Sequence, residues 1–423
     1  MTLDRPTRRT ARLDALRAKY APVLDKIAAG ALQRELDGTL PAEQVAWLKE
    51  AGFGALRVPV PFGGDGADWA ETTQLWIDLA TADQNLAQAL RGHFAFVEDR
   101  LWHHARGEDQ RAWFARFVAG EIAGNAWSEA GNAIETQNTV LSPDGGDWRI
   151  SGEKFYTTGT IYAEWADTYV RVGGTDDDGG GEPSFAIALV DTRLPGVTVL
   201  DDWDGFGQKG TGSGTARFED VPVAAENVIA FGERYPYQTA VYQLSHLATL
   251  AGIGRAALAD VVAQVRGRDR NYTHANAPRV RDDAQVLARV GELASATYAV
   301  EAIALRAADA VQDVFELAGA ADAVIDAANE NAELESSAGQ VVATELILKV
   351  TSDLFDTLGA SATSRGRALD RHWRNARTVS SHNPRILKSR VVGAHAVNGT
   401  PPPYAWGIGR TRRDTPTATS TTA

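Results

Sequence analysis

The sequence predicts an α+β protein in which a helical region, a block of short strands and a helical bundle follow one another. Helical periodicity covers residues 1 to about 121, for example in "LPAEQVAWLKEAGF", where the predicted helix ends at Gly52. From about 122 to 232 the pattern changes to short runs rich in β-branched and aromatic residues. From about 233 to 400 the 3.6-residue period returns, which is typical of a bundle.

The central block predicts a small antiparallel barrel, with a sandwich as the alternative. Its strand-like runs are "DWRISGEKFYTTG", "DTYVRVGG", "PSFAIALVD", "GVTVL" and "GTARFEDVPV". We expect the loop "GGTDDDGGGEP" to be a solvated tip, and residues 401–423 to form a flexible, low-complexity tail.

Composition narrows the function classes. The chain has 423 residues and a net charge of −13, which argues against a nucleic-acid partner. It has no cysteine, so disulfides, thiolate catalysis and zinc–thiolate sites are excluded, and no metal site is predicted. The N-terminus lacks the apolar segment of a signal peptide, and no run approaches the ~18 apolar residues of a membrane span. We therefore expect a cytoplasmic protein without a membrane partner.

Ordered motifs over residues 30 to 400 resemble the acyl-CoA dehydrogenase superfamily. The segments are "EAGFGALRVPVPFGGDGADWAETTQLWIDLATAD", "NAWSEAGNA", "WRISGEKFYTTG" and "FGQKGTGSGTARFEDVPVAAENVI". The resemblance implies that superfamily's fold: an N-terminal helical domain (1–121), a central antiparallel β-barrel (122–232) and a C-terminal helical bundle (233–400).

Three segments resemble more closely the flavin-dependent monooxygenase branch, typified by dibenzothiophene monooxygenase. They are "KFYTTGTIYAEWAD", "WDGFGQKGTGSGT" and "HWRNARTVSSHNP". That branch implies reduced FMN from a separate flavin reductase, O2 as co-substrate, and a C4a-(hydro)peroxyflavin that oxygenates sulfur or nitrogen of a small, largely apolar substrate.

The position of the dehydrogenase base holds no carboxylate. Acyl-CoA dehydrogenases place a Glu shortly after an "R-D-A-R" motif; here the motif is "RNAR" and Asn383 stands at the Glu position. A minority of the family places the base on the first bundle helix, where this chain has Ser245. An amide and a hydroxyl cannot act as that base at neutral pH. We assign both residues to the substrate pocket instead.

Two histidines and one threonine are the predicted catalytic residues. His382 replaces the Tyr of the lost Tyr–Glu pair, and His93 lies on a helix that in this fold runs beside the flavin. Either could hold and protonate the oxygen adduct, because the pKa of histidine is near the working pH. The alternative for each is a histidine satisfied in a helix interface. Thr157 aligns with the hydroxyl residue at the flavin N5 edge, and a plain strand residue is its alternative.

The first strand of the central block and the predicted hairpin supply further flavin contacts. Asn125 and Trp127 share one face by the two-residue period, and Ser128 follows them. Thr158 is the weaker neighbour of Thr157. Trp203 lies on the approach to the hairpin and is expected to shape the substrate pocket.

The FMN phosphate needs cations or backbone N–H groups. Lys209 and Ser213, in "GQKGTGSGT", are candidates, as is Arg270, which aligns with a phosphate-binding arginine from a neighbouring subunit. Arg374 and Arg377 are three residues apart, so on a helix they share a face. They either bind phosphate or brace the subunit interface.

FMN is favoured over FAD. The FAD-binding relatives hold the second nucleotide half with a "Q-x-x-G-G" segment, whereas this chain has Asp356 at the Gln and Ala360 at the second Gly. A carboxylate beside a pyrophosphate is repulsive. The resemblance also implies a homotetramer. Two alternatives to the monooxygenase stay open: an acyl-CoA dehydrogenase with a relocated base, and a relative that binds flavin without turnover.

Overall fold

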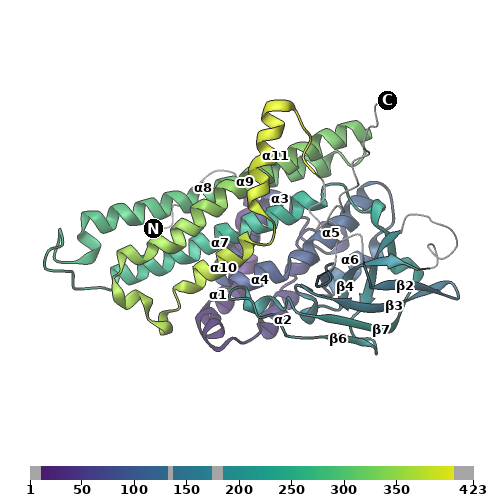
Figure 1. Ribbon diagram of the computed structural model, residues 1–423, viewed down its shortest axis with the longest axis horizontal. Helices are drawn as coiled ribbons and strands as arrows, with labels where there is room; N and C mark the ends of the chain where they lie inside the picture. Colours follow the sequence, from purple (N-terminus) through teal and green to yellow (C-terminus); the bar gives the residue numbers. More distant parts are fainter. Residues whose placement is uncertain (1–10, 132–136, 174–183, 404–423) are drawn as a thin grey trace, which may run out of the picture.

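The computed structural model describes residues 11–131, 137–173 and 184–403 (Figure 1). The predicted solvated loop lies almost wholly outside the described residues, as does most of the predicted tail. In the described part, helices come first, a sheet follows, and helices return, in the order that periodicity predicted. The helices before the sheet are α1 Ala11–Asp37, α2 Ala42–Glu50, α3 Trp69–Ala82, α4 Gln84–Ala89, α5 Arg91–Ala105 and α6 Arg111–Val118.

Local signals set several helix boundaries. α3 begins after Asp68, whose side chain accepts from the Glu71 backbone N–H at 2.7 Å while the Glu71 carboxylate accepts from the Asp68 N–H at 3.1 Å. This capping box satisfies two N–H groups that the helix itself leaves free. α2 ends at Glu50, just before Gly52 with φ of 76°, so the predicted stop is confirmed.

The central sheet is mixed and open. Its strands are β1 Ala123–Ala126, β2 Val140–Asp144, β3 Asp147–Lys154, β4 Trp165–Val172, β5 Phe185–Asp191, β6 Val197–Val199, β7 Ala216–Val223 and β8 Val228–Ala230. They pair in the order β6-β7-β3-β2-β4-β5-β8, with β1 beside β4. β1 and β2 both run parallel to β4.

The predicted closed antiparallel barrel is therefore wrong in two respects. The outermost strands of the paired order, β6 and β8, are three-residue strands with no ladder between them in the described chain, so the sheet does not close. Two of its pairings are parallel. Alternating sequence runs predict strands but not their partners, because strand pairing is non-local.

Five helices after the sheet complete the described fold: α7 Gln238–Arg266, α8 Ala284–Glu316, α9 Asp322–Asp353, α10 Asp370–Ser380 and α11 Arg385–Asn398. Figure 1 shows the long α7, α8 and α9 side by side, with the sheet at one end and α11 standing beside α9. The apolar core runs from α1 through α3 and α7 into α8 and α9.

α7 is the one described helix that is long and apolar enough, by length and composition, to cross a bilayer. It packs against α3, α8 and α9, and 56% of its most apolar window is buried inside the protein. The expectation that no run approaches the length and apolarity of a membrane span does not hold for α7. Its packing against three helices is that of a core helix.

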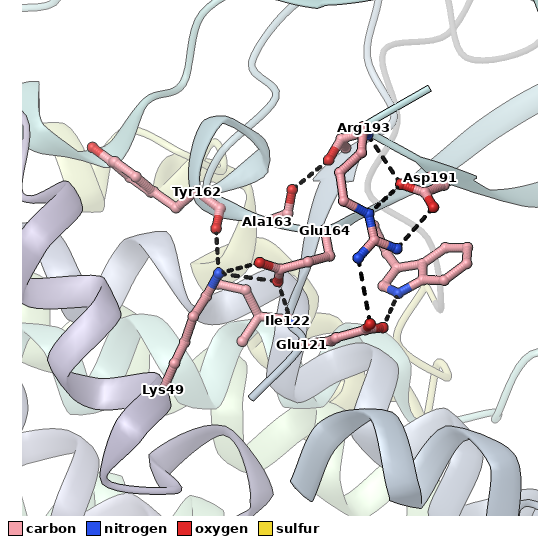
Figure 2. A network of polar contacts seen from close by, with 10 residues as sticks. Lys49, Glu121, Ile122, Tyr162, Ala163, Glu164, Asp191 and Arg193 are labelled. Carbon is pink, nitrogen blue, oxygen red and sulfur yellow. Dashed lines mark hydrogen bonds and ion pairs between the residues drawn. The ribbon is translucent and has the colours of Figure 1, made fainter. Parts of the chain in front are cut away.

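A polar network anchors the start of β1 (Figure 2). The Lys49 ammonium on α2 donates to the Glu164 carboxylate and to the Tyr162 carbonyl, both at 2.7 Å. Glu164 also accepts from the Ile122 backbone N–H at 3.0 Å. The network joins α2, the approach to β4 and the start of β1, and so helps to place β1, which carries Asn125.

Candidate active site

The end of α10 brings His382 to the start of α5. His382 lies in the turn after Ser380 and is an exposed residue. Its Nε2 is 2.7 Å from Nη1 of Arg91, the first residue of α5. Two segments almost 300 residues apart in the sequence thus meet through one side-chain pair.

The Arg91 contact determines the tautomer of His382. A guanidinium donates and never accepts, so Nε2 of His382 is the acceptor and the ring proton is on Nδ1. Desolvation, and then the charge of Arg91, hold the pKa of His382 well below its usual value. The residue His382 is exposed, yet its imidazole lies against the guanidinium of Arg91 and the ring of His246. It is therefore a neutral imidazole with an N–H group.

Arg91 is buried against β1 and α7. It is 4% exposed, its Nη2 donates to Oδ1 of Asn125 at 3.3 Å, and its guanidinium lies 5.1 Å from the ring centroid of Tyr242. The next residue is Gly92, where an added Cβ would meet the Asn125 backbone and side chain at 3.0 Å. The glycine therefore lets α5 approach β1 closely enough for Arg91 to reach Asn125.

Asn125 is the one predicted residue of its group that lies within β1. Its backbone N–H donates to the Thr158 carbonyl at 3.2 Å, and the Thr158 hydroxyl is 2.8 Å from that of Ser213. The structure thus joins Asn125, Thr158 and Ser213, three of the predicted flavin contacts, in one continuous polar edge. Thr157 lies beside them but is fully buried, and its hydroxyl donates to the Gly214 carbonyl at 2.8 Å.

Two placements differ from the predicted strands. Trp127 and Ser128 lie just beyond β1, and Thr157 and Thr158 lie in the turn after β3, which ends at Lys154. Trp127 is partly buried, and its indole N–H donates to Oδ1 of Asp167 at 2.8 Å, whereas Ser128 is exposed. The apolar alternation continues past both strand ends in the sequence, but there the regular ladder gives way to single backbone bonds, from Phe155 N–H to the Ser128 carbonyl at 2.9 Å and from Thr157 N–H to the Gly214 carbonyl at 3.1 Å.

A second histidine lies against His382. The ring of His246 on α7 is buried, and its centroid is 4.4 Å from that of His382. Its Nε2 has no hydrogen-bond partner in the described part of the chain. Burial, followed by the charges of His382 and Arg91, lowers its pKa well below 6.5, so this imidazole is also neutral.

A hollow opens beside this histidine pair. The residues that line it are His246, Leu250, Gln340, Thr344, Val379, Ser380, Asn383 and Arg385. The Asn383 amide donates to Oε1 of Gln243 at 2.9 Å, which ties the turn after α10 to α7. Ser245 points elsewhere: it is buried and its hydroxyl donates to the Tyr242 carbonyl of the same helix at 2.7 Å.

One carboxyl is buried on the α9 side of the bundle. Glu333 is 1% exposed, and neither of its side-chain oxygens has a hydrogen-bond partner among the described residues. Burial raises its pKa to about 8, and the nearby Lys388 on α11 opposes that shift. Lys388 is also buried, and desolvation lowers its pKa to about 8.

His93 lies in the core and does not contact His382. Its Nε2 donates to the Gly54 carbonyl at 2.8 Å, and its Nδ1 accepts from the Ala123 N–H at 3.3 Å. Burial lowers its pKa to about 4, so it is neutral, and backbone groups satisfy both ring nitrogens. Its role as a proton donor stays a prediction. These contacts favour a structural role in which His93 links Gly54 to the start of β1.

The predicted phosphate cations do not converge within one chain. Arg374 pairs with Glu35 and Asp370, each at 2.8 Å, so its donors join α10 to α1. Arg270 is exposed beyond the far end of α7, and the 20 residues of helix from His246 to Arg266 span roughly 30 Å. Arg270 thus lies far from His246 within its own chain.

Two further cations have no side-chain partner within the described part of the chain. Lys209 is exposed beside a shallow hollow that it shares with Arg34 and Asn85. Arg377 is partly buried on α10 and has no side-chain hydrogen bond or ion pair among the residues described. Their phosphate roles stay predictions.

Aromatic residues border the polar edge on the hairpin side. Trp203 is partly buried, its indole N–H donates to the Gly207 carbonyl at 3.2 Å, and its ring meets that of Tyr156 edge-on at 5.9 Å. Tyr156 precedes Thr157 and is 50% exposed. An accessible aromatic surface therefore adjoins the Thr158–Ser213 hydroxyls.

Sequence reasoning missed Arg91, Tyr242, His246 and Glu333. Signals were present for two of them. Arg91 is a charge within the otherwise apolar stretch "LRGHFAF", and His246 directly follows Ser245 in "SHLATLAGIG". Tyr242 and Glu333 gave no such signal, because only tertiary packing shows which helix faces meet.

Fold and site together define a flavin-dependent oxidoreductase. The chain belongs to the acyl-CoA dehydrogenase family: the N-terminal, middle and C-terminal domain models match residues 10–121, 126–221 and 244–384. It is 27% identical over 389 residues to dibenzothiophene monooxygenase of Rhodococcus qingshengii, covering 89% of this chain and 92% of that one.

Two solved structures are similar over almost their whole length. The methanesulfinate monooxygenase MsuC of Pseudomonas fluorescens superposes with a TM-score of 0.82 at 25% identity, covering 92% of this chain and 98% of that one. The complex of TdsC from Paenibacillus sp. A11-2 with FMN and indole superposes with a TM-score of 0.83 at 25% identity, covering 93% and 99%.

The residues of this site fit FMN. A flavin has a flat aromatic body with a polar edge, which the exposed Tyr156 and the Asn125–Thr158–Ser213 edge complement. Asp356, at the position that would hold a second nucleotide, is exposed and lies 3.4 Å from Arg289. The FMN preference stands on these contacts as well as on the similarity to an FMN complex.

Proposed function

We propose that this chain is the oxygenase component of a two-component system, using reduced FMN and O2 to add one oxygen atom to the sulfur or nitrogen of a small organic substrate. The observation that carries the proposal is the pair at the end of α10. Where a dehydrogenase needs a carboxylate, this chain has Asn383, which lines the hollow beside His246, and a neutral His382 bonded to Arg91.

FMN would supply the activation of O2. His382 would hold a proton on Nδ1 for the oxygen that is cleaved, because Arg91 occupies Nε2. Asn125, Thr158 and Ser213 would hold the polar edge of the flavin. Tyr242 and Trp127, whose rings meet at 5.8 Å, would help to keep water from the reacting atoms.

The proposal includes partners. A flavin reductase would supply reduced FMN by diffusion or transient contact. A homotetramer would bring Arg270 of a neighbouring subunit to the flavin phosphate, which is the arrangement its remote position in one chain supports. Lys209, Arg374 and Arg377 stay candidates for that phosphate. We place the enzyme in the cytoplasm, with neither nucleic acid nor membrane as partner.

The direct test mixes the protein with reduced FMN in air-saturated buffer and offers a panel of sulfides, sulfinates and amines. Product and hydrogen peroxide are measured together. We expect at least one class to divert oxygen from peroxide into product. Peroxide yields equal to those of free FMN with every compound would overturn the proposal.

The assembly has a separate test. Light scattering should give a tetramer, and Arg270→Ala should weaken FMN binding without changing the mass. A stable monomer that still binds FMN tightly would contradict this part.

A further inference from the structure

Among the residues that the structure describes, Arg91 is a buried cation without a counter-charge. Its side chain makes one hydrogen bond to His382, one long one to Asn125, and a ring contact with Tyr242. No carboxylate within the described ranges lies within ion-pair distance of it. A guanidinium carries five N–H donors, so these two bonds leave most of them unused, and Nε is buried without a partner.

A buried charge is normally paired, since burial without a partner is costly. The other buried arginines of the interior follow this rule: Arg57 lies 2.7 Å from Glu98, and Arg234 lies 3.0 Å from Asp167. Arg91 departs from it at the one place where α5, β1 and the turn after α10 meet. The missing partner is therefore expected to be a ligand.

The groups that surround Arg91 indicate which kind of ligand it would bind. Tyr242 and His246 come from α7, His382 from the turn after α10, and Asn125 from β1. None is an anion at neutral pH. His382 and Asn125 each offer the guanidinium one neutral acceptor, and Nε of Arg91 is left without any, so the site favours a small acceptor with negative charge.

We propose that the site around Arg91 and His382 selects substrates that carry a compact oxyanion, such as a sulfinate or a carboxylate, and that Arg91 is the residue that binds it. This deepens the proposed function and rests on it, because it names the class of substrate for the same site. Arg91 then acts as a specificity residue: it binds the charged end and holds the reacting atom beside His382. The paired N–H groups of the Arg91 guanidinium match the geometry of an anion with two oxygen atoms.

Binding, without turnover, is the test. Methanesulfonate is a compact oxyanion that needs no oxidation, and dimethyl sulfone is a neutral molecule of nearly the same shape. Isothermal titration calorimetry would measure the Kd of each, on protein without flavin and on protein saturated with oxidised FMN. We expect methanesulfonate to bind at least roughly tenfold more tightly than the sulfone, as for one charge-assisted contact.

Three variants sharpen the test. Arg91→Met should abolish the preference for methanesulfonate, and Arg91→Lys, which keeps the charge without the paired N–H groups, should retain part of it. Arg149→Met is the matched control, because Arg149 is exposed on β3 and pairs with Asp144 and Asp220. It should leave the preference unchanged. Circular dichroism of each variant establishes that it is folded.

Each outcome decides. Equal Kd values for the two probes, or an unchanged preference in the folded Arg91→Met or Arg91→Lys proteins, overturn the proposal. Competition between methanesulfonate and FMN assigns the oxyanion site to the cofactor phosphate and also overturns the substrate assignment. Failure of the monooxygenase assay together with retained selective binding would reject the proposed reaction instead, so the two failures are distinguishable.

Discussion

Two buried arginines, Arg234 and Arg91, lie beside the contacting rings of Trp127 and Tyr242 but differ in their charged neighbours. Arg234 lies between two acids, 3.0 Å from Asp167 and 3.4 Å from Asp99. Arg91 has no acid at all among its described neighbours. The rings between them, Trp127 and Tyr242, contact each other, and each has one of the guanidiniums near its face.

The pKa values follow this difference. Burial lowers the pKa of Arg91 to about 10, whereas the charges of Asp167 and Asp99 outweigh burial and raise that of Arg234. The comparison teaches that burial alone does not identify a functional charge. The charge of Arg234 is neutralised by Asp99 and Asp167, so this cluster holds the sheet to the helices. The charge of Arg91 is not neutralised by a described residue, so Arg91 is available to a ligand.

The largest expected effect is on the Arg234 cluster. Arg234→Met leaves the buried Asp167 without its cation, while Asp99 keeps Arg100, and this should destabilise the protein by about 3–5 kcal/mol. Chemical unfolding followed by circular dichroism, at one protein concentration, measures it. The exposed Arg149→Met should change stability by no more than ~0.5 kcal/mol. A loss under about 1 kcal/mol for Arg234→Met would show that the cluster is not structural.

Next in size is the loss of the histidine that Arg91 orients. His382→Gln should lower the ratio of oxygenated product to peroxide by about 10²-fold, since a positioned proton donor contributes at least that much. His103→Gln is the control, because His103 bonds Glu108 near the end of α5. Equal ratios in the two variants would remove His382 from the chemistry.

The pH dependence of the His382 step has a definite sign. The pKa of His382 is lowered well below 6.5, so its neutral, Nδ1-protonated form is present throughout the neutral range. The His382-dependent part of the product ratio should therefore stay flat as the pH rises from 6 to 8. A fall centred near the ordinary histidine pKa, present in the wild type and absent in His382→Gln, would contradict this.

The fold was predictable where local pattern decides. Capping at Asp68 and the stop at Gly52 are signals within a few residues of the boundary they set. The closed barrel was wrong because partner choice depends on contacts between distant residues: β1 pairs with β4 about 40 positions later, and in parallel.

Helix geometry explains what was missed in the site. On α5 the sequence drew attention to His93, but residues two apart on a helix point about 200° away from each other. Arg91 therefore faces His382, while His93 faces Gly54 in the core. The same applies to Ser245 and His246, which are adjacent on α7 and have different partners.

A smaller effect tests the buried carboxyl of Glu333 on α9, which lies near Lys388. The folded-state pKa of Glu333 is raised to about 8, so the native state binds more protons than the unfolded state between about pH 4.5 and 8. Its contribution to stability is present below that window and is lost as the pH rises through it. Glu333→Gln should abolish this decline, which is on the order of 3 kcal/mol between pH 5 and 7.5.

The measurement compares unfolding midpoints at the two pH values. Lys388 titrates at the upper edge of the window and shifts stability in the opposite direction above it, so the comparison stops at pH 7.5. Glu345→Gln, on the exposed side of α9, is the control. Parallel pH profiles for the wild type and Glu333→Gln would show that Glu333 ionises without cost in the folded protein.

The smallest expected effect is on stability when Arg91 is replaced. Arg91→Met removes a buried charge and leaves no carboxylate behind, so the lost hydrogen bonds to His382 and Asn125 are offset by the removed desolvation cost. Its unfolding free energy should stay within about 1 kcal/mol of the wild type, while Arg234→Met loses several times more. A loss for Arg91→Met as large as that for Arg234→Met would mean that Arg91 is a structural residue, and the contrast between the two arginines would then be one of partners and not of roles.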